Sequence, residues 1–286
     1  MRICRFDEDK LGVVIGENVH DVTAAQDEIR KHARYDMMGD AVIAALPEWR
    51  GRIEEMAKKA PGKPISQVNL LPPVARFSKV MAAPTNYHDH IAEMAARQGT
   101  PADAHRGIQA AGIFLKANSS VIGMSETIPL RFPEKLNEHE LEIVMIIGKK
   151  GTDITIDKAL DHVAGYCMGL DMTVRGKEDR SFRKSIDGYS PIGPWMVTAD
   201  EIPDPDNLDI ELTVNGVTKQ KSNTKYLIYN CRKLIEFASS HYTLYPGDLF
   251  FTGTPAGVSP VKPGDWVTAS SPKIGELKIQ ATAHKQ

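Results

Sequence analysis

The feature that most constrains the fold is a long series of short strand-like segments that follows a proline-rich connector. The connector reads PGKPISQVNLLPPV, and its prolines and glycine prevent a continuous helix there. We therefore place a boundary near residue 73. Beyond it, short apolar runs separated by turn sequences recur, and only a few helical segments interrupt them. Helices and strands do not alternate strictly, which argues against a doubly wound parallel sheet.

Turn sequences support this strand-rich prediction. Asn215-Gly216 stands between two alternating runs, as in a β-hairpin. A Pro-Gly-Asp sequence begins at both Pro246 and Pro263, as in type II turns. The expected strands cover residues 2–6, 11–15, 79–83, 113–117, 140–147, 164–174, 195–198, 208–214, 249–252, 266–270 and 275–282. The expected helices cover residues 41–59, 86–97, 157–162 and 225–240. The chain is thus predicted to be an α+β protein, mostly β.

Composition excludes several classes of partner. The 286 residues carry a net charge of −2 and contain no basic stretch, so we expect no nucleic-acid partner. The longest apolar runs, 41–46 and 143–147, are far shorter than the roughly 20 residues that a spanning helix needs. The first residues, MRICRFDEDKLG, lack the apolar segment of a signal peptide. We therefore expect no membrane association and a cytoplasmic location.

Cysteines and common cofactor motifs give mostly negative evidence. The 3 cysteines form no CxxC pair, which favours reduced, buried thiols over disulfides or a zinc site. No GxxxxGK[ST] loop, GxGxxG, HExxH or GxSxG sequence is present. Nucleotide-binding and serine-hydrolase functions therefore have no support.

Carboxylates embedded in apolar strands are the first candidate site. Glu140 and Glu142 begin the run EHELEIVMIIG, and their two-residue spacing on a strand puts both on one face. Asp171 lies inside AGYCMGLDMTV, where an ionised carboxylate must be paired, protonated or bound to a cation. Together they could form an oxygen site for Mg²⁺ or Mn²⁺. The alternative is that both glutamates begin the strand in solvent and Asp171 pairs with Arg175.

A second cluster, NYHDHIAE, offers a general base. If this segment is helical, His90 and Glu93 lie three residues apart on one side, and the carboxylate can orient the imidazole. The alternative is a solvated helix face with an incidental histidine and glutamate. His88 is off that face and is expected to be structural or exposed.

These clusters belong to a set of segments that resembles a known family. In order along the chain they read NYHDHIAE, FLK, ELEIVMIIGK, GYCMGLDMTVR, KSIDGYSPIGPW, VNGVTKQKSNT and PGDLFFTGTPAGVSPVKPGD. In sequence and order they resemble the fumarylacetoacetate hydrolase family of metal-dependent enzymes, over roughly residues 78–282. The resemblance strengthens both functional interpretations above.

The resemblance implies roles for particular residues. It implies that Glu140, Glu142 and Asp171 hold Mg²⁺ or Mn²⁺. It also implies that His90 and Glu93 activate water and that Lys184 lies beside the developing negative charge.

The resemblance also implies substrate-binding residues. Arg175 and the backbone at Gly253 and Thr254 would hold substrate oxygens. Three departures from the family pattern concern substrate identity. Leu170 replaces the usual Asn before the metal Asp, Thr173-Val174-Arg175-Gly176 stands in place of an SARD-like segment, and Glu178 replaces a frequent Gln in that pocket-lining segment. A glutamate there would disfavour a second substrate carboxylate nearby.

The fold implied by the resemblance is a β-rich roll of mixed sheets over residues 74–286, preceded by a small α+β domain and linker over 1–73 whose expected role is packing and dimer support. A homodimer is also implied. The implied activity is hydrolysis of a C–C bond in a 2,4-dioxo acid to pyruvate or a related 2-oxo acid and a carboxylic acid. The alternative is decarboxylation or isomerisation of a 2-oxo dicarboxylate such as oxaloacetate. A non-catalytic protein that binds a metal or metabolite is a third hypothesis.

Overall fold

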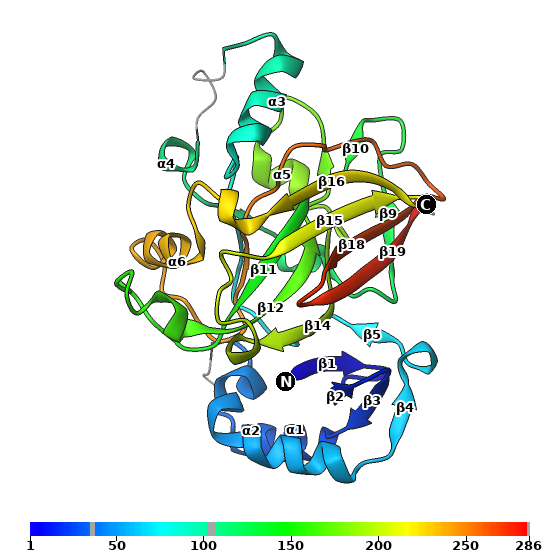
Figure 1. Ribbon diagram of the computed structural model, residues 1–286, viewed down its shortest axis with the longest axis vertical. Helices are drawn as coiled ribbons and strands as arrows, with labels where there is room; N and C mark the ends of the chain where they lie inside the picture. The colour runs from blue at the N-terminus through cyan, green and yellow to red at the C-terminus, as the bar shows by residue number, and fades with distance from the viewer. Residues whose placement is uncertain (35–37, 102–106, 285–286) are drawn as a thin grey trace.

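A large mixed sheet forms the centre of the molecule (Figure 1). The computed structural model describes residues 1–34, 38–101 and 107–284. The sheet has 12 strands in the order β4-β3-β2-β1-β14-β12-β11-β17-β6-β7, with β5 beside β1 and β8 beside β14. Their bounds are β1 Arg2–Phe6, β2 Lys10–Ile15, β3 Asn18–Asp21, β4 Gly62–Pro64, β5 Leu70–Leu71, β6 Val80–Ala82, β7 Phe114–Lys116, β8 Val121–Ile122, β11 Leu141–Ile147, β12 Val163–Leu170, β14 Ser190–Thr198 and β17 Leu249–Phe251.

The N-terminal residues extend this sheet. β1 pairs antiparallel with β14, so that Ile3 lies opposite Met196. Helices α1 (Thr23–His32) and α2 (Ala41–Lys59) lie beside these strands at one end of the molecule (Figure 1). The bounds of α2 agree with the predicted helix 41–59, whereas α1 was not predicted. The division of the chain near residue 73 remains a prediction.

Two smaller sheets complete the strand content. A 5-stranded sheet has the order β16-β15-β18-β19-β9, and β10 pairs with β13 in a separate ladder. Asn215 and Gly216 have φ angles of 51° and 78°, and they connect β15 to β16 as the predicted hairpin turn. The bounds are β9 Thr127–Leu130, β10 Asn137–Glu138, β13 Thr173–Val174, β15 Asp209–Val214, β16 Val217–Asn223, β18 Trp266–Ser271 and β19 Gly275–Ala283. The prediction of a mostly β, α+β fold is confirmed.

Helices and short 3₁₀ turns surround the sheets. The remaining helices are α3 His88–Gln98, α4 Ile108–Ala111, α5 Arg180–Lys184 and α6 Cys231–Ser239. The predicted helix 225–240 begins later than expected, because Asn230 caps α6 by accepting the Lys233 N–H at 3.0 Å. The short helix predicted at 157–162 is the 3₁₀ helix Ala159–His162.

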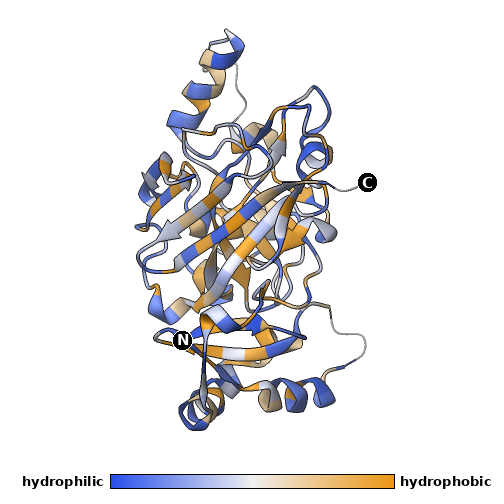
Figure 2. Ribbon diagram, turned by 90° about the vertical axis from the view of Figure 1, so that its right-hand side faces the viewer, coloured by the Kyte–Doolittle hydropathy of each residue, from blue (hydrophilic) through white to orange (hydrophobic). Residues whose placement is uncertain are grey.

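The main core lies where the large and the five-stranded sheets face each other. β11 is buried at every position, so apolar side chains pack on both of its faces. Figure 2 shows apolar residues along the central strands and mixed polar and apolar positions on the helices. Within the described ranges, no helix is both long and apolar enough to cross a membrane.

All three cysteines are buried free thiols, which predicts low reactivity in the native protein. Cys4, Cys167 and Cys231 each have 0% exposure. Burial raises the pKa of Cys4 to about 12, and it raises the pKa of the other two thiols as well. Because only the thiolate reacts readily, native protein treated with iodoacetamide near pH 8 should gain no adduct by mass spectrometry. The denatured chain, as the control, should gain one on every cysteine; alkylation of the native protein at the same rate would contradict this burial.

Candidate active site

The three predicted carboxylates converge at one end of the β11–β12 pair. These strands are antiparallel with Leu141 opposite Leu170, so Glu140, just before β11, lies beside Asp171, just after β12. The Asp171 N–H donates to the Glu140 carbonyl at 2.9 Å. One carboxylate oxygen from each of Glu140, Glu142 and Asp171 lies within 4.8 Å of the others. The two-residue spacing on β11 therefore does bring both glutamates to one face.

Burial and charge at this triad fit a divalent cation. Glu140, Glu142 and Asp171 are 5%, 1% and 1% exposed, so the alternative of glutamates in solvent is wrong. Glu142 accepts the Gly253 N–H at 2.5 Å and has no Lys or Arg partner among the described residues. Burial and the charges of Asp171 and Glu140 raise its pKa well above the usual value. A buried all-oxygen set with this excess of negative charge is suited to Mg²⁺ or Mn²⁺.

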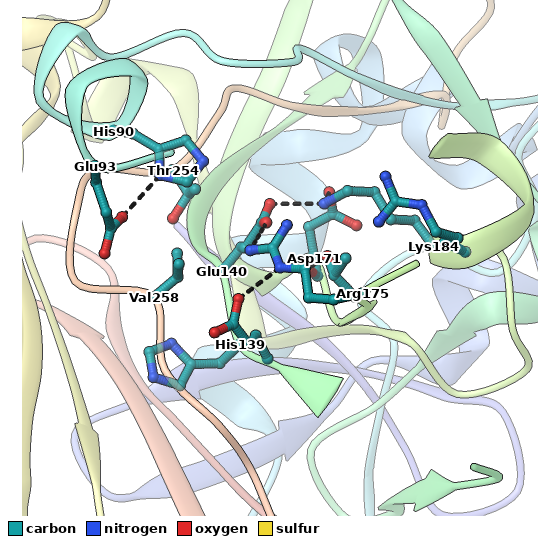
Figure 3. A network of polar contacts seen from close by, with 12 residues as sticks. His90, Glu93, His139, Glu140, Asp171, Arg175, Lys184, Thr254 and Val258 are labelled. Carbon is teal, nitrogen blue, oxygen red and sulfur yellow. Dashed lines mark hydrogen bonds and ion pairs between the residues drawn. The ribbon is translucent and has the colours of Figure 1, made fainter. Parts of the chain in front are cut away.

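Two lysines and an arginine contact the other two carboxylates, and Figure 3 labels Lys184 and Arg175 among them. Lys184 Nζ donates to Glu140 Oε2 and to Asp171 Oδ2, both at 2.6 Å. Lys116 Nζ donates to Asp171 Oδ1 at 2.5 Å. Burial alone would raise the pKa of Glu140, but the charges of Lys184 and Arg175 lower it well below its usual value. Asp171 therefore pairs with Lys116 and Lys184. The alternative prediction that Asp171 pairs with Arg175 is wrong.

Helix α3 contributes the predicted His90–Glu93 pair. His90 Nδ1 lies 3.1 Å from Glu93 Oε2, and His90 is buried in the first turn of the helix. Burial would raise the pKa of Glu93, but the hydrogen bond from His90 and the charge of Arg97 lower it. A carboxylate that accepts from Nδ1–H leaves Nε2 able to take a proton. His88 is exposed, as predicted.

Both ends of helix α3 are fixed to neighbouring loops. The buried Asn86 side chain donates to the Thr252 carbonyl at 2.8 Å and accepts the Tyr229 N–H at 2.7 Å. A Cβ at Gly253 would come within 2.6 Å of Asn86 Cβ, which explains the glycine there. At the other end, Arg97 donates to Glu138 at 2.8 Å. These contacts hold His90 close to the carboxylates.

One cavity unites these groups. The triad, His90 and Lys184 all line it. In the view of Figure 3, Glu140 and Asp171 lie between His90 and Lys184. Side chains of three different chemistries, an acidic triad, an oriented imidazole and an ammonium, therefore face the same space. Such a set can bind an anionic ligand, activate water and stabilise negative charge.

The predicted substrate-binding residues divide into two groups. Arg175 and Thr254 line the cavity, and Gly253 contacts Glu142. Arg175 is also paired with Glu138 at 2.5 Å and with Glu140 at 2.9 Å. Glu178 lies outside the cavity: it is exposed, lines a separate surface hollow and is 3.8 Å from Lys135.

Several residues at this site have no role predicted from the sequence. Lys116 ends the FLK segment at 114–116. A lysine at the end of an apolar strand is the sequence feature that could have indicated its role. Glu138 had no such signal, because its partners Arg97 and Arg175 lie 41 and 37 residues away. The cavity is also lined by Arg180 and Arg183 of α5.

Comparisons with known proteins agree with this geometry. The family described as "Fumarylacetoacetate (FAA) hydrolase C-terminal" matches residues 79–281. The maleylpyruvate hydrolase of Aquipseudomonas alcaligenes is 46% identical over 98% of both chains. The oxaloacetate tautomerase Fahd2a of Rattus norvegicus is 37% identical, over 78% of this chain and 72% of that one. The crystal structure of maleylpyruvate hydrolase from Sphingobium sp. SYK-6 in complex with manganese(II) and pyruvate has a TM-score of 0.85, 36% identity and full coverage of both chains. The chain therefore belongs to the fumarylacetoacetate hydrolase family.

Proposed function

We propose that the protein is a divalent-metal-dependent hydrolase that cleaves the C3–C4 bond of a 2,4-dioxo acid. The products are pyruvate or a related 2-oxo acid and a carboxylic acid. The observation that carries this proposal is the cavity that the Glu140, Glu142 and Asp171 triad shares with His90, whose imidazole is oriented by Glu93. It is supported by the likeness to two maleylpyruvate hydrolases, one of them solved with manganese(II) and pyruvate.

The triad would hold the metal ion. Its carboxylates supply only oxygen ligands, which Mg²⁺ and Mn²⁺ both accept, so the metal available in the cell decides between them. When bound there, the ion supplies Lewis acidity toward the carboxylate and keto oxygens of a 2-oxo acid. Glu142, which has no cationic side-chain partner in the described residues, is the carboxylate that gains most from such an ion.

His90 acts as the general base. Its Nε2 takes a proton from water while Glu93 holds the Nδ1–H and stabilises the imidazolium. The resulting hydroxide attacks C4, and the C3–C4 bond breaks with its electron pair passing to C3. The imidazolium then returns its proton to C3, so the histidine regenerates and atoms and charge balance. General-base catalysis typically contributes about 10²- to 10⁴-fold.

Lys184 stabilises the negative charge that forms on the pyruvate half. Its ammonium is buried and held at 2.6 Å from both Glu140 and Asp171, which fixes it at the base of the cavity. A donor fixed before the reaction costs no reorganisation when charge develops. Arg175 and Thr254, which line the cavity, complete this end of the proposed substrate site, whereas the Gly253 N–H is already donated to Glu142.

The proposed reaction predicts a metal-dependent release of two acids. Protein stripped with chelator and then given Mg²⁺ or Mn²⁺ should consume a 2,4-dioxo acid, measured as loss of enol absorbance. It should also release pyruvate and a carboxylic acid in equal amounts. Chelated protein is the control and should be inactive. Turnover that does not require added metal, or enol loss without a second acid, would contradict the hydrolase.

The second candidate is isomerisation or decarboxylation of a 2-oxo dicarboxylate. The likeness to the rat oxaloacetate tautomerase favours testing it. With oxaloacetate, a tautomerase changes enol absorbance without forming pyruvate, whereas a decarboxylase releases pyruvate and CO₂. Decarboxylation needs no water to attack carbon, so it should withstand loss of His90 better than hydrolysis does.

We also propose that the protein acts as a cytoplasmic homodimer with a small-molecule substrate. The residues before 73 would form the smaller unit, and those after it carry every residue assigned above to the site.

A further inference from the structure

One polar side chain of the edge strand β16 is fully buried, although the reaction proposed above does not use it. β16 forms one edge of the five-stranded sheet, and Lys219 and Lys221, on either side of Gln220, are exposed. Gln220 itself has 0% exposure. It belongs to the segment VNGVTKQKSNT, which is part of the family resemblance. A buried amide costs free energy unless its hydrogen bonds are satisfied, so its partners indicate what it stabilises.

Two backbone groups fix the orientation of this amide. Gln220 Oε1 accepts the Leu141 N–H at 2.9 Å, and Gln220 Nε2 donates to the Pro255 carbonyl at 2.7 Å. Because a backbone N–H can only donate and a carbonyl can only accept, the amide cannot be turned over. His139 Nδ1 lies 2.9 Å from the same Oε1 and is therefore a donor too. One N–H of the amide remains to be assigned.

This remaining N–H determines what the Thr254 hydroxyl can do. Gln220 Nε2 donates to Thr254 Oγ1 at 2.7 Å. A hydroxyl has a single hydrogen, and for that of Thr254 the described residues provide no acceptor. Thr254 lines the cavity, and in the view of Figure 3 it lies between His90 and Glu140. The hydroxyl is therefore held as a donor toward the cavity, and the hydrogen bond that it accepts polarises it further.

The loop that carries Thr254 is held between β16 and the triad. A Cβ at Gly257 would lie only 2.1 Å from the Lys219 carbonyl oxygen, so only glycine allows the loop to approach β16 this closely. On the other side of Thr254, the Gly253 N–H donates to Glu142 at 2.5 Å. The hydroxyl is thus fixed one residue away from a contact with the proposed metal site.

We propose that Gln220 is a positioning residue that holds the Thr254 hydroxyl as a hydrogen-bond donor to the 2-oxo acid. This inference rests on the proposed hydrolase function, and it extends the substrate site to a residue of the second sheet. A donor that is oriented before binding contacts an anionic oxygen without reorganisation. Without Gln220, the hydroxyl would be free to rotate away from the ligand.

Binding of pyruvate to the manganese-loaded protein tests this role without turnover. Thr254→Val should raise the Kd for pyruvate by roughly 10- to 100-fold, as expected for loss of a hydrogen bond to a charged group. Thr254→Ser keeps the hydroxyl and should stay within about threefold of the wild type. Gln220→Met should raise the Kd by roughly 3- to 30-fold, but by less than about twofold in the Thr254→Val background. Titration calorimetry would measure each Kd.

Two further variants separate positioning from a structural role. Ser259→Ala removes a hydrogen bond at the far side of the same network, where Ser259 Oγ lies 2.8 Å from His139 Nε2, and it should leave the Kd for pyruvate unchanged. Gln220→Glu serves where Gln220→Met does not fold, because its carboxylate still accepts the Leu141 N–H. That carboxylate would also take the Thr254 hydrogen, so the Kd should rise more in the presence of the Thr254 hydroxyl than in the Thr254→Val background.

A failure of this inference differs from a failure of the proposed function. If the manganese-loaded wild type does not bind pyruvate, the proposed function fails. If Thr254→Val binds pyruvate as tightly as the wild type, or if the Gln220 variants raise the Kd equally with and without the Thr254 hydroxyl, the hydrolase stands and the positioning role is wrong. Loss of the manganese-induced rise in Tm in Gln220→Met would also overturn it, because the effect would then act through Leu141 on Glu140 and Glu142.

Discussion

A His90→Ala variant is expected to lose roughly 100-fold or more of kcat for C–C hydrolysis while it keeps its metal ion. The imidazole is oriented by Glu93 at 3.1 Å and lines the same cavity as the carboxylates, but it is not one of the three acidic ligands. Its removal therefore takes away the proton acceptor and leaves the metal site unchanged. Steady-state kinetics with metal at saturation would measure the loss. Thermal unfolding with and without metal would show that the metal-induced rise in Tm is retained.

His88→Ala is the matched control for this variant. It removes an exposed imidazole from the first turn of the same helix α3, and its activity should remain within about twofold of the wild type. Glu93→Gln should give an intermediate loss, because the amide still accepts a hydrogen bond but no longer stabilises an imidazolium. Full hydrolysis by His90→Ala would refute the general base. Retained release of pyruvate from oxaloacetate by the same variant would favour the decarboxylase instead.

The sequence predicted helices whose ends and buried faces are set by neighbouring residues, and it failed where distant contacts set them. The helix 41–59 was found with its bounds, since Asp40 caps it by accepting two N–H groups and apolar residues follow at helical spacing. Helix α1 was missed, because no side chain caps it and only Ala25, Gln26 and Ile29 are buried. The late start of α6 also had a long-range cause: the preceding backbone at 228–229 donates to Asn86 and cannot continue the helix.

At the site, too, local patterns predicted only what depends on neighbouring residues. The spacing of Glu140 and Glu142 on an apolar run predicted a shared face without any tertiary information. The proximity of Asp171 depends on the register of β11 against β12, and Lys116 reaches Asp171 across 55 residues of chain. Glu178 shows the opposite case: the family pattern predicts it in the substrate pocket, whereas in the structure it is exposed and lines a separate surface hollow. Long-range pairing decides which charged side chains share a cavity.

A Glu142→Gln variant is expected to lose metal binding without losing the fold. The glutamine carbonyl can still accept the Gly253 N–H, but the ligand charge is gone. In chelator, its Tm should equal or exceed that of the wild type, because the buried Glu142 lacks a cationic side-chain partner among the described residues and is repelled by Asp171 and Glu140. Metal at about 100 times Kd stabilises the wild type by about 2.7 kcal/mol, which for a chain of 286 residues is roughly 4 to 5 °C in Tm. The variant should show no such rise, and its kcat should fall roughly 1,000-fold.

Glu142 tests the metal site better than Glu140 does. Glu140→Ala would also remove one of the two partners of Lys184 and one of the two partners of Arg175, so a lower Tm would arise from weakened ion pairs as well as from the metal site. Glu276→Gln, at an exposed position of β19, controls for the change in net charge and should keep both the metal-induced rise and the activity. A Glu142→Gln protein that still gains the full wild-type rise with Mn²⁺ would exclude Glu142 as a ligand. A variant that gains nothing from metal yet hydrolyses at the wild-type rate would show instead that the reaction does not need the triad.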